Sequence, residues 1–397
     1  MHHLYALGIA YASTPLISTP ILTARSITVL WSSWCDNLTL TNQDNPQECV
    51  LHYAGTALTS HQKAHFSTAS NALRCGASGM LWGARVAFFG SAMHDGLRGY
   101  VVDGREVVLF ASDVEREAGA DEVQTYMLGG EEEGVVTDIK VLSDGEVLIR
   151  LKAREAGTES LVRMRDFEHF RARLSSGSVA GGAAVQIPFV SHSSPQCVAN
   201  ATTVSVLDAV RKVWTSTKDP RYPKCLGRWY DGTSDFVAIP YLSESSIMKI
   251  ASGGYMSAAL SSEGELFLWG QACPGSMEEL AVLSEDMEGT QPSTGITAEG
   301  DQDEFVKCLE VWIEGQEASV YDVAIGYGHI LVAAESSGSA GEKKRSLFVA
   351  GDNSRNQLGL GAQGDFFKDF EEVVALRGKQ VTQLAAAGWS SFIVTLG

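Results

Sequence analysis

Residues 247–270 read IMKIASGGYMSAALSSEGELFLWG, and this stretch decides the fold. The glycine pair at 253–254 ends a first strand, because glycine lets the backbone turn where other residues are strained. Residues 257–260 are small and apolar, as a tightly packed inner strand requires, and a short turn separates them from an outer strand at 265–269. The stretch therefore predicts a unit of antiparallel strands that ends in a glycine.

The same unit recurs twice toward the C-terminus, at residues 323–351 and 381–395. The last copy has an inner strand but no outer strand after it. The missing strand is found at the N-terminus, because LYALG at 4–8 matches LFVAG at 347–351 and LFLWG at 266–270. Pairing of the two ends would leave no exposed strand edge, so we predict one blade shared between the N-terminal and C-terminal segments.

These units resemble the repeat of the regulator of chromosome condensation family. The family repeat has an inner strand ending in Ala-Leu, an outer strand ending in Trp-Gly and a Gln-Leu-Gly connection, which correspond here to 259–260, 269–270 and 357–359. The resemblance implies an all-β fold, a seven-bladed β-propeller closed by pairing the N-terminal strand with the last blade, with acidic loop insertions.

One position departs from the family pattern. The inner strand of the family repeat usually carries a histidine, and the corresponding residue here is Met256, His329 or, in the last copy, a residue near Ser391. We therefore expect only one of these three blades to keep the hydrogen bond of that histidine.

The repeat is weaker between residues 9 and 246. Residues 27–40 followed by 49–55 predict an early copy, and residues 139–149 predict a hairpin, because an Asp-Gly pair stands there between alternating apolar residues. Residues 204–214 have apolar side chains at helical spacing, which predicts a helix on a blade connection. The remaining blades are inferred from closure of the propeller.

Two acidic segments interrupt the pattern. We interpret residues 113–134 as an acidic insertion and residues 276–304 as an acidic flexible loop, both within one β-propeller domain spanning residues 1–397. Either the segments only keep the protein in solution, or one of them attracts a basic partner. The net charge of −18 favours a basic partner and argues against binding to the phosphates of nucleic acid.

The seven cysteines are scattered, and no C-x-x-C pair indicates a zinc or redox site. We expect reduced thiols and a location in the cytoplasm, the nucleus or both. No apolar run reaches the roughly 18 residues of a membrane span, so we expect no contact with a membrane. The chain is predicted to be monomeric by itself.

No motif indicates catalysis or cofactor binding. Residues 378–380 read Gly-Lys-Gln and so lack the serine or threonine of a phosphate-binding loop. His61 and His65 lie one helical turn apart, but Gln62 stands where a metalloprotease carries its glutamate. We therefore predict no catalytic residue, no cofactor and no metal.

The leading hypothesis for function is a non-catalytic scaffold that binds another protein. Within the family, the chain looks most like the fungal alpha-tubulin-suppressor branch, whose members act in diphthamide synthesis and in Elongator-dependent tRNA modification. The resemblance implies a small zinc-binding protein of diphthamide synthesis as the partner. Two alternatives stay open: guanine-nucleotide exchange on a Ran-like small GTPase and, by analogy of fold alone, a hydrolase with a site in the central channel.

The candidate partner-binding residues are of two kinds. Tyr255, Tyr327 and Trp389 stand in turns near the starts of inner strands, at one rim of a propeller, where aromatic side chains are good anchors for a partner. A structural role between blades is the alternative for these three. The acidic candidates lie in the two acidic segments and are Glu131, Glu132, Glu133, Asp301, Asp303 and Glu304.

Overall fold

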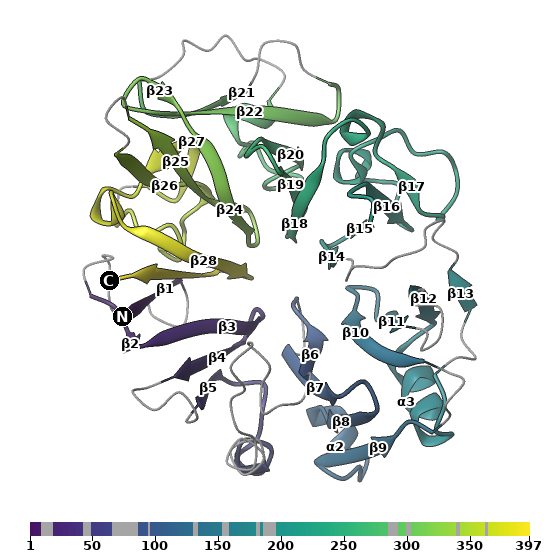
Figure 1. Ribbon diagram of the computed structural model, residues 1–397. Coiled ribbons are helices and arrows are strands. Elements are labelled where there is room, and N and C mark those ends of the chain that lie inside the picture. Colours follow the sequence, from purple (N-terminus) through teal and green to yellow (C-terminus); the bar gives the residue numbers. More distant parts are fainter. Residues whose placement is uncertain are drawn as a thin grey trace. The chain divides into compact units, whose positions relative to one another are not determined.

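The computed structural model describes residues 1–8, 19–42, 49–65, 86–93, 96–129, 134–152, 159–179, 183–185, 196–284, 293–298, 303–338, 342–361 and 364–397. The chain divides into two compact units, residues 1–23 with 195–397 and residues 24–194. The first unit holds four β-sheets and the second holds three. All seven sheets are antiparallel, and they are the blades of a seven-bladed β-propeller, which confirms the predicted fold class (Figure 1).

The first unit carries the blades whose repeats are clearest in the sequence. We name each blade after the strand with which its chain segment begins: β14, β18, β24 and β28. The β28 blade is completed by the two N-terminal strands. The strands are β14 (Gln196–Ala199), β15 (Thr203–Leu207), β16 (Val213–Thr217) and β17 (Val237–Ala238); β18 (Ile247–Gly253), β19 (Met256–Ser261), β20 (Leu266–Gly270), β21 (Gly295–Ala298), β22 (Val306–Ile313) and β23 (Gln316–Glu317); β24 (Ser319–Ile325), β25 (His329–Ser337), β26 (Lys343–Asp352) and β27 (Phe366–Glu372); β28 (Gln380–Ala387), β29 (Ser390–Leu396), β1 (His2–Gly8) and β2 (Leu22–Ala24).

The second unit contains the weaker repeats. The predicted early copy forms the β3 blade, and the predicted hairpin is present, with Ile139 opposite Ile149. The helices α2 and α3 accompany the strands. The elements are β3 (Ser26–Ser32), β4 (Asp36–Asn42) and β5 (Cys49–Gly55); β6 (Val86–Ser91), β7 (Gly96–Val102), β8 (Glu106–Phe110), α2 (Asp113–Glu117) and β9 (Val123–Met127); β10 (Val135–Val141), β11 (Val147–Lys152), β12 (Glu159–Met164), α3 (Phe167–Ser175) and β13 (Ala183–Val185).

The N-terminal strand completes the last blade, as predicted. β1 pairs antiparallel with β29 over its whole length, from His2 opposite Leu396 to Gly8 opposite Ser390. Gly8, Gly270 and Gly351 close the three matching strands with φ values of +105°, +107° and +99°. A Cβ at any of the three would lie within 2.2 Å of a carbonyl oxygen on the paired strand's turn. The glycine that ends each sequence copy is therefore required by backbone geometry.

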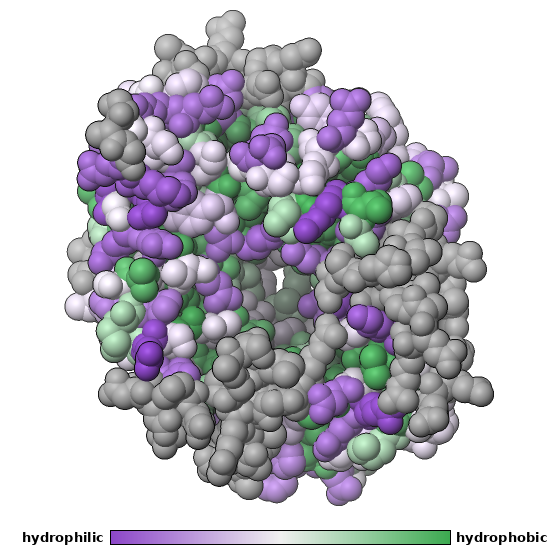
Figure 2. Space-filling model, in the orientation of Figure 1, coloured by the Kyte–Doolittle hydropathy of each residue, from purple (hydrophilic) through white to green (hydrophobic). Residues whose placement is uncertain are grey.

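The core lies between neighbouring blades. Ala258 and Leu260 of β19 pack into a cluster shared with the β24 blade, whereas Ala259 packs into a cluster shared with the β14 blade. Both faces of β19 are thus buried, which explains its small apolar residues. Polar side chains gather at the surface over β23 and β26, at the upper left of Figure 2. Between β25 and β26, the carboxylate of Glu335 pairs with Arg345, with 3.2 Å between Oε2 and Nε.

The predicted helix at 204–214 is wrong. The segment forms β15 and the start of β16, joined by a tight turn in which the Asp208 carboxylate accepts hydrogen bonds at 2.8 Å from Trp214 Nε1 and from the Lys212 N–H. All five residues of β15 are buried. Burial of both faces removes the alternation that marks a half-exposed strand, so the apolar spacing matched a helix by coincidence.

The two acidic segments contain regular structure. Residues 113–134 hold α2 and β9, the outer strand of the β6 blade. Residues 276–304 hold β21 and the short helix η5 (Ala281–Leu283), in which Val282 and Leu283 are buried. Whether these segments are insertions, and whether the loop is flexible, stays a prediction.

The cysteines depart in one place from the expectation of reduced thiols. Cys49 is disulfide-bonded. Five cysteines are not in disulfides: Cys35, Cys197, Cys225, Cys273 and Cys308. Among the described helices, none combines the length and the hydropathy that a membrane span requires.

Candidate functional site

Three turns of the first unit carry the aromatic residues predicted to bind a partner. Tyr255 lies between β18 and β19, Tyr327 between β24 and β25, and Trp389 between β28 and β29. The main-chain N–H of Tyr327 donates to the carbonyl of Gly388, beside Trp389, at 2.7 Å. The turns of these two neighbouring blades are therefore fixed to each other.

Glycine makes the close approach of the other turns possible. Gly254, beside Tyr255, has a φ of +54°, and a Cβ there would lie 3.1 Å from the main chain of both Tyr327 and Gly328. Its carbonyl accepts a 2.7 Å hydrogen bond from the N–H of Ala201 in the β14 blade. Turns from four successive blades thus touch one another along one rim of this unit.

The side chains on these turns form a row of aromatic rings. The ring centroids of Tyr255 and Tyr327 are 6.2 Å apart, with the rings edge to face. Tyr222, from the connection between β16 and β17, lies 5.0 Å from Tyr255 on the other side. All three rings are half-buried. We name Tyr222, Tyr255 and Tyr327 the aromatic row.

Two guanidinium groups lie on aromatic rings at this rim. Arg355 stands 5.3 Å from the ring centroid of Trp389, and Arg221 stands 5.6 Å from that of Tyr222. Both arginines are exposed. Arg221 is also bonded to both carboxylate oxygens of Asp219, at 2.7 and 2.6 Å. The rim therefore offers aromatic faces and hydrogen-bond donors together.

Sequence reasoning found only part of this rim. Tyr255, Tyr327 and Trp389 were predicted because they lie in repeat units, and the structure brings Tyr255 and Tyr327 into contact. Sequence reasoning missed Tyr222 and Arg355, because they lie in blade connections where the repeat imposes no residue type. Cross-blade contact is the only signal that identifies these two residues.

Burial keeps the phenols and thiols at and near this rim in their neutral forms. It raises the pKa of Tyr255 and of Tyr327. It also raises the pKa of Cys273 to about 11 and that of Cys225 to about 12. These groups are therefore able to donate hydrogen bonds at pH 7.

The acidic candidates are distributed differently. Glu131, Glu132, Glu133 and Asp301 lie outside the described residues. The Asp303 carboxylate accepts hydrogen bonds from the N–H groups of Phe305, at 2.9 Å, and Val306, at 3.0 Å, and so is fixed at the beginning of β22. Glu304 is exposed beside it.

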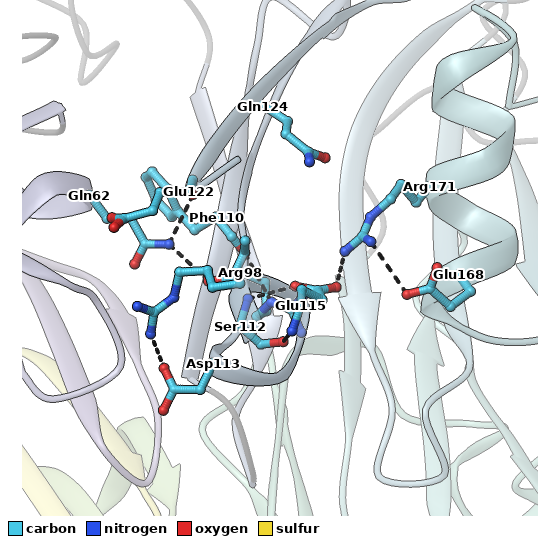
Figure 3. Close-up of polar contacts among 12 residues, drawn as sticks. Gln62, Arg98, Phe110, Ser112, Asp113, Glu115, Glu122, Gln124, Glu168 and Arg171 are labelled. Carbon is cyan, nitrogen blue, oxygen red and sulfur yellow. Dashed lines mark hydrogen bonds and ion pairs between the residues drawn. The ribbon is translucent and has the colours of Figure 1, made fainter. Parts of the chain in front are cut away.

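The acidic segment after β8 is anchored by a group of buried charges (Figure 3). The carboxylate of Glu115 in α2 lies between two guanidinium groups, that of Arg98 at 2.7 Å and that of Arg171 from α3. The same carboxylate accepts the N–H of Ser112 at 2.5 Å, which completes the cap of α2. This carboxylate therefore links α2, in the β6 blade, to α3, in the blade that begins with β10, and is not available to a partner.

The two histidines at helical spacing are occupied with other groups. His61 Nδ1 lies 3.4 Å from the Glu122 carboxylate, and His65 Nε2 lies 3.5 Å from the Tyr100 hydroxyl. Within the described ranges, no three histidine, cysteine, aspartate or glutamate side chains are grouped so that they could hold a metal ion.

Comparison with known proteins adds evidence on the fold. No protein-family model matches the chain. No curated protein matches its sequence. Among solved structures, Prp20p from Saccharomyces cerevisiae, studied for its binding to Gsp1p and histones, is 13% identical, with a TM-score of 0.57 over 100% of this chain and 91% of that chain.

A second solved structure is that of yeast RCC1 (Prp20) bound to Kap60. It is 12% identical, with a TM-score of 0.56, and the match covers 100% of this chain and 89% of that chain. At this level of identity the likeness shows the fold alone. The chain has the β-propeller fold of the regulator of chromosome condensation type.

Proposed function

We propose that this protein is a non-catalytic scaffold that binds a protein partner at the rim formed by the aromatic row and Trp389. The observation that carries the proposal is the ring contact between Tyr255 and Tyr327 on the turns of two neighbouring blades. The turn that carries Tyr327 does not need an aromatic residue for its own geometry, because the same position is occupied by Gly254 and Gly388 in the other two turns.

The rim has the properties of a binding hot spot. Its aromatic rings are half-buried, and the turns that carry them are linked by hydrogen bonds between blades. Rigid aromatic side chains lose little conformational entropy when a partner covers them, so they contribute much of the affinity of protein interfaces. Prp20p and its complex with Kap60 support protein binding as a use of this fold, by analogy.

The resemblance in sequence supports a narrower proposal. We propose an adaptor in diphthamide synthesis and Elongator-dependent tRNA modification, located in the cytoplasm or nucleus, with a small zinc-binding protein as its partner. Glu131, Glu132, Glu133 and Asp301 are retained as a second contact region for that partner. The five cysteines that are not in disulfides support a reducing compartment.

Co-purification tests the scaffold directly. The tagged full-length chain should recover one stoichiometric protein from cells, identified by mass spectrometry, and the double variant Tyr255→Ala/Tyr327→Ala should lose it. Tyr126→Ala, a half-buried tyrosine of the β6 blade, is the matched control and should retain the partner. Thermal unfolding of each variant checks that the fold persists. Recovery of the same partner by the double variant would exclude this rim.

Guanine-nucleotide exchange on a Ran-like small GTPase is the second candidate, favoured by the structural likeness to Prp20p, which binds Gsp1p. An exchanger must displace the phosphates and the magnesium ion of the bound nucleotide. The decisive measurement is release of fluorescent GDP from Ran with and without the purified chain. An unchanged release rate removes this candidate and leaves the scaffold.

A further inference from the structure

Trp229 is unusual among the tryptophans of this protein. It lies in the connection between β16 and β17, and its side chain is 70% exposed. The six other tryptophans that the structure describes are buried or half-buried. An exposed indole leaves apolar surface in water, worth roughly 25 cal/mol for each Å² that a partner would cover.

The exposed indole is rigidly supported. The buried guanidinium of Arg228 donates at 2.9 Å to the main-chain carbonyl of Trp229 and at 3.0 Å to that of Thr215 in β16. The edge of the indole packs against the buried ring of Phe305, with 5.1 Å between centroids and 85° between planes. The side chain is therefore held in one orientation before any partner arrives.

Acidic side chains lie close in sequence to both rings of this contact. Asp231, two residues after Trp229, is exposed, and its hydrogen bond with the N–H of Thr233 holds its pKa below the ordinary value. The Oδ2 atom of Asp231 lies 3.9 Å from the Arg228 guanidinium, which also donates to main-chain carbonyls. Asp303 is bonded to the N–H of Phe305, Glu304 adjoins it and is exposed, and Lys307 donates to the carbonyl of Asp303. In the two segments that carry the rings, the three carboxylates therefore outnumber the two cations.

We propose that Trp229, Asp231, Asp303 and Glu304 form a docking surface for an arginine-bearing segment of a partner protein. We name these four residues the Trp229 surface. A guanidinium plane stacks on an indole face and at the same time donates hydrogen bonds to carboxylates, so both features of the surface select the same side chain. The proposal concerns a different surface from the aromatic row and does not depend on it.

Fluorescence anisotropy with a labelled peptide of alternating glycine and arginine tests the proposal. Trp229→Ala should raise the Kd about tenfold, the loss expected for a desolvated cation–π contact, whereas Trp229→Phe should restore much of the affinity. A peptide of alternating glycine and glutamate should not bind. Unchanged affinity of Trp229→Ala for the arginine peptide would overturn the proposal.

A second pair of variants separates binding at the Trp229 surface from general attraction of the arginine peptide to an acidic protein. Asp231→Asn/Glu304→Gln removes two charges from the Trp229 surface, and Glu117→Gln/Glu263→Gln removes two exposed charges elsewhere. The first pair should weaken peptide binding several-fold more than the second, and equal effects would overturn the proposal. Tyr255→Ala/Tyr327→Ala should bind the peptide normally, so a failure here is distinguishable from a failure of the aromatic row.

Discussion

The Nε2 atom of His329 lies 3.0 Å from the hydroxyl oxygen of Ser391, and this contact joins the second strand of the β24 blade to that of the β28 blade. His329 stands opposite Gly351 in its sheet. In the two other copies, Met256 stands opposite Gly270 and Ser390 stands opposite Gly8. The histidine position in the last copy is therefore Ser390. Ser391 is the residue that the histidine contacts.

Acid should weaken the fold through His329. Complete burial lowers the pKa of this imidazole from 6.5 to about 4. The unfolded chain then binds a proton at this imidazole more tightly than the folded chain does. The free energy of unfolding is therefore highest above pH 6.5 and decreases as the pH falls toward 4. Urea unfolding should show a loss of about 2 kcal/mol between pH 7 and pH 5, at about 1.4 kcal/mol per pKa unit. His329→Asn should show a smaller pH dependence, and parallel curves for the two proteins would contradict this assignment.

Gly326 should be intolerant of alanine because the same imidazole covers it. A Cβ at Gly326 would lie 2.0 Å from Cε1 of His329. Gly326→Ala should lower the free energy of unfolding by about 1–3 kcal/mol, as overpacking in a core does. Gly364→Ala, where the nearest atom is 3.7 Å away, is the control and should be near neutral. His329→Ser should relieve part of the Gly326→Ala defect, and strict additivity of the two would refute the proposed clash.

Asp322 should matter more than an ordinary surface carboxylate because it links three blades. Its carboxylate pairs with Lys249 of β18 and accepts the N–H of Leu384 in β28 at 2.6 Å. Asp322→Asn should cost about 1–3 kcal/mol of unfolding free energy, since a charge-assisted network is broken at a half-buried position. The exposed Asp369→Asn in β27 is the control. Equal midpoints of urea unfolding for the two variants would argue against the link.

Glu115 should stabilise the second unit. Its carboxylate is 12% exposed and faces two guanidinium groups that are 8% and 19% exposed, those of Arg98 and Arg171. Glu115→Gln removes the anion that the two guanidinium groups share, although Arg171 keeps the exposed carboxylate of Glu168 at 3.5 Å. Removal of one partner from a buried pair costs about 3–5 kcal/mol. Glu117→Gln on the same helix, at an exposed position, should have little effect. Hydrogen exchange of the α2 amides should accelerate only in the first variant.

The candidate rim was partly predictable. Tyr255 and Tyr327 were identified because their turns recur in the sequence. Tyr222 and Trp229 were not, because both lie in the connection between β16 and β17, where the repeat imposes no residue type. Their roles depend on residues that are distant in sequence, as the contact between Trp229 and Phe305 shows.

By itself, the sequence determined the features that one strand and its turn impose. Gly8, Gly270 and Gly351 are such features, because a positive φ beside a paired strand excludes a side chain whatever the rest of the chain does. Only the tertiary structure decided which blades touch, through pairs such as His329 with Ser391. It also decided that residues 204–214 form strands, because burial on both faces is imposed by the neighbouring blades and overrides the local periodicity.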